Sequence, residues 1–231
     1  MLTEGIDGER VHARGIARSS TRAAALRGEI ARLAVYSAQM SEPSVGEGLY
    51  ADAIATLDRW SATSPKADEG RRRTLALLRD GPCVLNRAHR AGHLTASTMI
   101  LDPTGQMLLC LHGRLNLWMQ VGGHCEPTDT ALATAALREA TEESGIAGLV
   151  LVPDPIDVDV HPTRCRPADD EPATATFHFD IRYVAVAPAA MVEQVSDESH
   201  ALGWFTADNL PAPLADGVRS QIAPALARAG L

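Results

Sequence analysis

Three glutamates occupy one turn of a helix-forming segment, and this spacing constrains the chain more than any other feature. Glu139, Glu142 and Glu143 lie in the run from Leu137 to Ile146, just after an alanine-rich stretch. Because each residue of an α-helix advances by about 100°, Glu142 and Glu143 fall about −60° and +40° from Glu139. The three carboxylates therefore share one arc. Like charges in one turn repel each other, and at a helix C-terminus they also oppose the macrodipole.

A hard divalent cation that prefers oxygen ligands, Mg²⁺ or Mn²⁺, would compensate these charges. Apolar and small residues surround the preceding helical turns, which indicates a helix buried in a domain, and Gly122-Gly123 lies just upstream. The alternative is a surface helix whose acidic end is solvated by water. From the residues alone, both interpretations stay open.

The same region resembles the Nudix box, a long motif that marks a family of hydrolases. The matching positions are Gly123, Asp129, Arg138, Glu139, Ala140, Glu142, Glu143, Gly145 and Ile146. The similarity runs from about Leu94 to Pro211, so residues 1–80 lie outside it. The resemblance implies an α/β (α+β) fold with a mixed β-sheet between helices. It also implies a metal-dependent hydrolase that cleaves a phosphoanhydride bond of a nucleoside diphosphate derivative or a similar small diphosphate.

The resemblance also assigns roles to residues. Glu142 and Glu143 would be metal ligands, Glu139 a ligand or the base that deprotonates water, and the Gly123 carbonyl would complete the inner shell. Arg138 would orient the carboxylates through charge-assisted hydrogen bonds. Glu198, in the later Ser196–Ser199 segment, is a second candidate for the catalytic base, since some relatives recruit an acid there; the alternative is an ordinary polar turn.

The box departs from the family pattern before the helix. Asp129 replaces the usual glutamate, and the spacer to Arg138 is one residue longer than usual. On a continuous helix nine residues place the two side chains about 180° apart, so a direct pair between them is not expected. We therefore predict that Asp129 is the N-cap of the helix and accepts from the amides of Ala131 or Leu132.

Periodicity and turn residues predict a chain of interspersed helices and strands. The expected strands are Leu94–Leu101, Gln106–Leu111, Trp118–Val121, Leu149–Val152, Ile156–Val160, Phe177–Val186 and Leu202–Phe205. The expected helices are Thr21–Met40, Gly48–Trp60, Ala67–Leu78, Thr130–Ser144 and Asp216–Arg228. Cys165–Thr174 is expected to be a surface loop between two strands.

The chain divides into residues 1–80, a helical extension whose first 20 or so residues are expected to lack order, and residues 81–231, the hydrolase domain. The extension is expected to matter for assembly, which leaves a homodimer open, but not for chemistry. A chain that begins near Gly81 should therefore still bind metal and hydrolyse substrate.

Composition limits the partners. The formal net charge of −8 and the pI near 5.4 disfavour a nucleic-acid partner bound through its backbone. A small diphosphate remains compatible, provided that metal ions neutralise it locally. The sequence has no apolar run long enough to span a membrane and no CxxC pair, so we expect a reduced, cytoplasmic protein.

Other residues suggest weaker alternatives. Cys125 beside His124, or His161 with Cys165 and His178, could bind a soft metal, but no spacing rule supports either set. Trp118 could stack on a base or belong to the core. Two other functions stay open: an isoprenoid-diphosphate isomerase of the same fold, which would need a catalytic cysteine in an early strand, and a non-catalytic module that senses a nucleotide.

Overall fold

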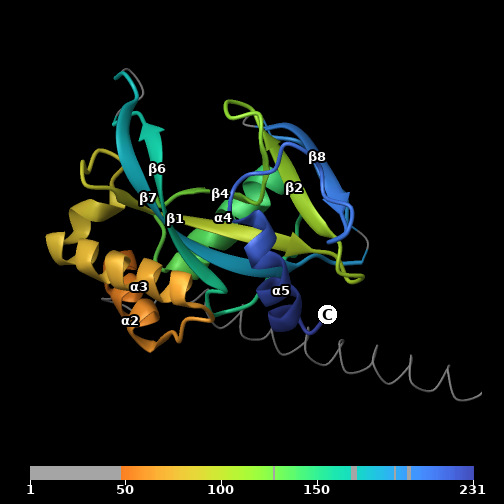
Figure 1. Cartoon of the computed structure of the whole chain (residues 1–231), viewed down its shortest axis with the longest axis horizontal. Helices are drawn as coiled ribbons and strands as arrows, with labels where there is room; N and C mark the ends of the chain where they lie inside the picture. The colour runs from red at the N-terminus through yellow and green to blue at the C-terminus, as the bar shows by residue number, and fades with distance from the viewer. Residues whose placement is uncertain (1–47, 127, 168–170, 190, 197–198) are drawn as a thin grey trace, which may run out of the picture.

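A computed structural model describes residues 48–126, 128–167, 171–189, 191–196 and 199–231. Its helices are α2 (Leu49–Arg59), α3 (Pro65–Leu77), α4 (Leu132–Ser144) and α5 (Val218–Ala229), with short 3₁₀ turns at Leu78–Asp80 and Pro82–Leu85 (Figure 1). Its strands are β1 (His93–Leu101), β2 (Met107–His112), β3 (Trp118–Met119), β4 (Val121–His124), β5 (Val150–Leu151), β6 (Asp157–Cys165), β7 (Thr174–Val186) and β8 (Ser199–Phe205). The expected elements within these residues are present, except that the single expected strand Trp118–Val121 is divided into β3 and β4, and β6 continues beyond Val160 to Cys165. The predicted helix Thr21–Met40 and the expectation for the first 20 residues lie outside the described residues.

Within the described residues the strands form one eight-stranded sheet, and this sheet is mixed, as predicted. β1 lies at its centre and runs parallel to β7 from the pair His93↔His178 to the pair Leu101↔Val186. On its other edge β1 pairs antiparallel with β4 over its first half and with β2 at Ile100 and Leu101 only. The expected β1–β2 hairpin is therefore short, because β2 turns away to pair with β8.

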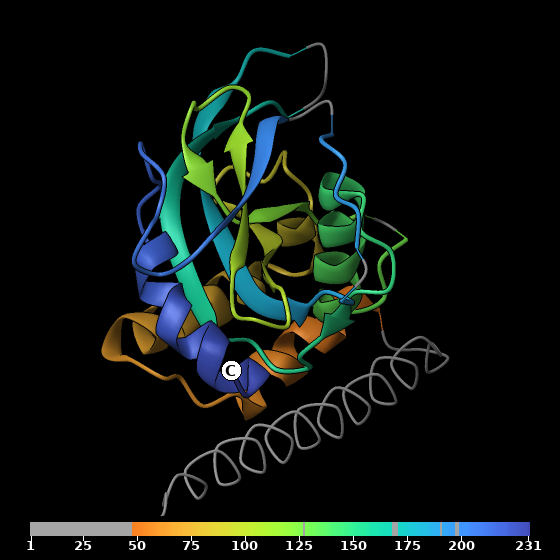
Figure 2. The same ribbon diagram turned by 90° about the vertical axis from the view of Figure 1, so that its right-hand side faces the viewer.

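Helices cover both faces of this sheet. Figure 2 shows α4 and α5 on opposite sides of the strands. Leu94, Ala96 and Ile100 of β1 belong to the core that includes α2, α3 and α4. Met99 and Leu101 alternate with them and pack in the second core, against α5. This alternation is what a strand covered on both faces requires.

Helices α2 and α3 are part of the main core. Leu57 of α2 and Ala67 of α3 are fully buried in the core cluster that also contains α4. A Cβ on Gly70 would lie 2.1 Å from the Val158 carbonyl oxygen, so the missing side chain lets α3 approach β6. No helix in the described part of the chain is long and apolar enough to cross a membrane.

Candidate metal and catalytic site on α4

The carboxylates of α4 face the glycine pair of β4. The Gly122 amide donates to Glu143 Oε2 at 2.8 Å. A Cβ on Gly123 would lie 2.6 Å from Glu139 Oε2, so the end of the Glu139 side chain would have to move to make room for it. The Gly-Gly sequence therefore lets β4 lie close to both carboxylates, with Gly122 beside Glu143 and Gly123 beside Glu139.

Arg138 bridges the acidic residues around it. Its Nη1 donates to Glu139 Oε1 at 3.1 Å and to Glu142 Oε2 at 3.0 Å. Its Nη2 donates to the carbonyl of His124 at 3.0 Å, and the same nitrogen reaches Asp129. The hydrogen bond to Asp129, together with the charge of Glu139, raises the pKa of Arg138, so its positive charge offsets part of the repulsion between the carboxylates.

The prediction that Asp129 caps the helix is wrong. Asp129 receives Arg138 Nε at 3.1 Å on one oxygen and Nη2 at 2.9 Å on the other, and it also accepts from the Glu126 amide at 2.7 Å. Helix α4 begins only at Leu132, so Asp129 lies in the loop before it. A separation of about 180° holds only for a continuous helix, whereas here the longer spacer forms a loop that folds back onto Arg138.

A residue from α2 caps α4 instead. Asp52 Oδ2 accepts from the Leu132 amide at 2.8 Å, and Thr134 Oγ1 accepts from the Ala131 amide at 3.1 Å. Asp52 lies 80 residues before Leu132, and no local signal connects the two. The other end of α4 is as expected, since Gly145 adopts a left-handed conformation with φ of 68°.

The donor set of α4 fits a hard cation. Carboxylate oxygens from three glutamates within one helical turn, next to a glycine backbone that passes close by, are the ligands that Mg²⁺ and Mn²⁺ prefer. The side chains of Glu139 and Glu142 differ in exposure, at 14% and 58%. The site therefore has a sheltered side against β4 and an open side from which a substrate could approach. Glu198 lies outside the described residues.

The cysteines near this site are protonated thiols. Burial, together with the charge of Glu143, raises the pKa of Cys110 to about 12. Burial and the charge of Asp129 raise the pKa of Cys125 to about 12, and Cys125 packs against the core. Cys83 is exposed in the 3₁₀ turn Pro82–Leu85. Neither Cys110 nor Cys125 has the environment of an activated nucleophile, which counts against the isomerase alternative.

Trp118 contributes to packing. Its ring meets Phe205 of β8 edge to face, with ring centroids 5.1 Å apart, and it borders the core beneath α5. A stacked base is not needed to account for its position.

Comparison with known proteins agrees with this geometry. The family model described as NUDIX domain matches residues 92–226, more than half of the chain, so the chain belongs to the Nudix family and is a Nudix-type hydrolase. No curated protein matches the chain significantly.

Similar solved structures include a MutT NUDIX hydrolase from Burkholderia pseudomallei, with 24% identity, coverage of 57% of this chain and 95% of that chain, and a TM-score of 0.39. An ADP-ribose pyrophosphatase from Streptococcus suis has 21% identity, coverage of 58% and 89%, and a TM-score of 0.38. The NUDIX domain of Shewanella oneidensis NrtR, complexed with ADP ribose, has 20% identity, coverage of 62% and 91%, and a TM-score of 0.43.

Proposed function

We propose that the chain hydrolyses a phosphoanhydride bond of a nucleoside diphosphate derivative or a similar small diphosphate, with Mg²⁺ or Mn²⁺ as cofactor. The observation that carries the proposal is the grouping of Glu139 and Glu143 against Gly122-Gly123, with Glu142 held beside them by Arg138. Diphosphates carry dense negative charge and are repelled by a cluster of carboxylates. They can bind at such a cluster only when cations lie between the carboxylates and the phosphates.

The residues of the α4 site have different proposed roles. Glu139, Glu142, Glu143 and the Gly123 carbonyl would hold the metal. When bound, the metal neutralises phosphoryl oxygens and makes a bound water more acidic. Glu139, the more sheltered of the two α4 glutamates that Arg138 contacts, is our first candidate for accepting a proton from the attacking water, and Glu198 is the second. Arg138 is assigned as a positioning residue, because its guanidinium holds Asp129, Glu139, Glu142 and the His124 carbonyl together.

The wider setting of this function follows from the sequence. We propose a small-molecule diphosphate as the partner and the cytoplasm as the location, and we leave a homodimer as an open possibility. The acidic net charge of −8 favours a small ligand with bound cations over a nucleic-acid surface.

A substrate panel tests the proposal. Sugar nucleotides, dinucleoside polyphosphates, oxidised nucleotides and cap-like ends are incubated with the full chain and Mg²⁺ or Mn²⁺, and the release of phosphate or nucleoside monophosphate is measured. We expect turnover of at least one class, dependent on added metal and abolished by chelation. Turnover that persists unchanged in chelator would contradict the metal assignment. Nucleotide binding without any hydrolysis would favour the sensing module.

A further inference from the structure

A second group of metal-binding side chains lies around His124, the last residue of β4. The ligand atoms of His93, His124, Cys165 and His178 all lie within 4.8 Å of one another. Cys165 Sγ is 3.1 Å from His178 Nε2 and 3.5 Å from His124 Nε2. We propose that these four residues bind one Zn²⁺ ion in a tetrahedral site of three nitrogens and one sulfur.

The sheet itself brings the four residues together. At this end the strands run in the order β4, β1, β7, β6, and each contributes one ligand. His93 pairs directly with His178, and Thr95, two residues after His93, pairs with His124. Cys165 is the last residue of β6, four residues beyond the partner of His178. Because side chains alternate along strands, this register places all four on one face.

One histidine of the cluster has no hydrogen-bond partner among the described residues. His93 is fully buried, and neither of its ring nitrogens has a hydrogen-bond partner among the described residues. Its ring stacks on His124 at a centroid distance of 5.1 Å and meets His178 edge to face at 5.0 Å. Buried polar atoms are nearly always paired. The unpaired nitrogens of His93, next to three other side chains that can bind a metal, therefore indicate that a metal ion binds here.

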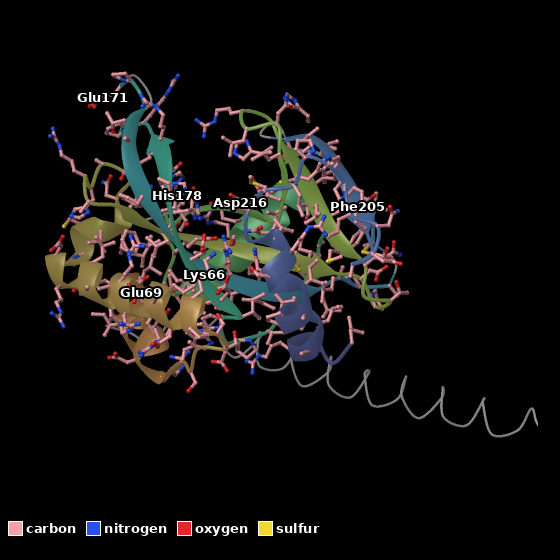
Figure 3. The ribbon with its side chains drawn as sticks, in the orientation of Figure 1. Lys66, Glu69, Glu171, His178, Phe205 and Asp216 are labelled. Atoms are coloured by element: carbon pink, nitrogen blue, oxygen red, sulfur yellow. The ribbon has the colours of Figure 1, made fainter. Side chains whose placement is uncertain are left out.

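The electrostatics of His93 and His178 agree with neutral imidazole ligands. Burial, helped by the neighbouring His124, lowers the pKa of His93 to about 4 and that of His178 to about 3. At neutral pH each ring is therefore a neutral imidazole, which has one nitrogen without a proton, as a metal ligand requires. In Figure 3, His178 lies on β7 between Glu171 and the body of the sheet.

The donor atoms select the class of metal. Imidazole nitrogen and thiolate sulfur favour zinc, whereas Mg²⁺ avoids sulfur. With Zn–N bonds of about 2.0–2.1 Å and a Zn–S bond of about 2.3 Å, ligand atoms of a tetrahedral site lie roughly 3.3–3.8 Å apart, so small movements would close this cluster on an ion. Four protein ligands leave no open position, so the ion would be structural.

His161 is not part of the set, although the sequence offered it with Cys165 and His178. Its Nδ1 lies 3.0 Å from Asp159 Oδ2, and its ring meets only the edge of His178, at 5.4 Å. His93 and His124 take the remaining positions. Their contribution depends on β4 lying next to β1 and on β1 lying next to β7, which the spacing of residues along the chain does not reveal.

The zinc site would also support the site on α4. His124 follows Gly123 directly, and its carbonyl accepts from Arg138 Nη2 at 3.0 Å. An ion bound to the His124 side chain would fix the end of β4 from which Gly122 and Gly123 meet the glutamates. Residue 124 thus belongs to both sites, with its backbone facing one and its imidazole the other.

The metal content of the full chain tests the proposal first. Protein purified without a polyhistidine tag and dialysed against excess Mg²⁺ should retain about one zinc per chain by mass spectrometry. After removal of zinc, Co²⁺ should produce the visible bands of tetrahedral cobalt and a thiolate-to-cobalt charge-transfer band. Protein without zinc, together with a six-coordinate cobalt spectrum lacking the charge-transfer band, would overturn the proposal.

Matched variants then assign the ligands. Cys165→Ser should abolish the charge-transfer band, and His178→Gln should weaken Co²⁺ binding at least ~100-fold, since even outer-shell partners contribute about 10–100-fold. Cys125→Ser and His161→Gln change neighbouring residues that are not proposed ligands. These variants should keep both the charge-transfer band and the Co²⁺ affinity. If Cys165→Ser does not fold, loss of thermal stability in wild-type protein on chelation, restored by zinc, supports the site. Loss of the band in Cys125→Ser instead would overturn the assignment.

Discussion

The carboxylate site on α4 and the histidine–cysteine site of the sheet differ in how the chain builds them. The first draws its side-chain ligands from one helical turn, and its spacing follows from 100° per residue. The second draws one ligand from each of four strands, and Cys165 lies 41 residues from His124 and 13 from His178. A helix fixes its own geometry, whereas a sheet site exists only after the register is set, so only the first can be inferred from spacing.

The two sites also differ in chemistry. The α4 site offers oxygen atoms with an open side, as the 58% exposure of Glu142 shows. The sheet site offers nitrogen and sulfur in a closed cluster with a fully buried His93. One arrangement suits a cation that must meet substrate and water, and the other an ion that holds strands together.

The largest expected effect concerns whether the α4 site can form without helices α2 and α3. A chain that begins at Gly81 loses α2 and α3, which bury Leu57 and Ala67 in the core of α4 and supply the cap Asp52. We expect such a chain to be insoluble or unfolded, contrary to the prediction from sequence that it stays active. Circular dichroism and turnover are compared with a chain that begins at Gly48, which keeps both helices. An active, folded Gly81 chain would show that the site is more self-contained than the packing indicates.

The next largest effect is a loss of turnover in variants that stay folded. Glu143→Gln or Glu142→Gln should lower turnover at least ~100-fold in saturating metal, because each removes a charged metal ligand. Circular dichroism should be unchanged. Glu69→Gln, which changes an exposed acid on α3 (Figure 3), is the matched control and should keep full turnover. Near-normal turnover of both box variants would remove the metal role from these residues.

The features that could be predicted from the sequence are those that depend on local signals. The mixed fold, the glutamate helix and its end at Gly145 were predictable, because hydrophobic period and glycine placement are local signals. The pairing of Asp129 with Arg138 was not, because it depends on a loop conformation rather than on helix geometry. The role of α2 was also not predictable, since contacts across 80 residues leave no trace in spacing.

A third prediction sharpens the role of the loop before α4. Asp129→Ala should leave Arg138 without its buried partner and cost about 1–3 kcal/mol of unfolding free energy, with lower turnover as Arg138 loses its orientation. Urea unfolding and steady-state kinetics measure the two effects. A loss of stability with full turnover would show that Arg138 needs no positioning by Asp129.

The smallest expected effect concerns the cap of α4. Asp52→Ala removes the acceptor for the Leu132 amide and should cost about 1 kcal/mol in urea unfolding. Asp58→Ala, on an exposed position of the same helix, is the control and should change stability little. Equal stability of the two variants would mean that water replaces the cap.

The most direct test of the account measures both metals on the same proteins. Zinc content and Mn²⁺ affinity, the latter from the electron paramagnetic resonance signal of free Mn²⁺, are determined for wild type, Glu143→Gln and Cys165→Ser. We predict that Glu143→Gln keeps zinc and loses most Mn²⁺ affinity, whereas Cys165→Ser loses zinc and, while folded, still binds Mn²⁺. If zinc follows Glu143 instead of Cys165, or if wild type binds only one kind of metal, the two sites are not what their donor atoms indicate.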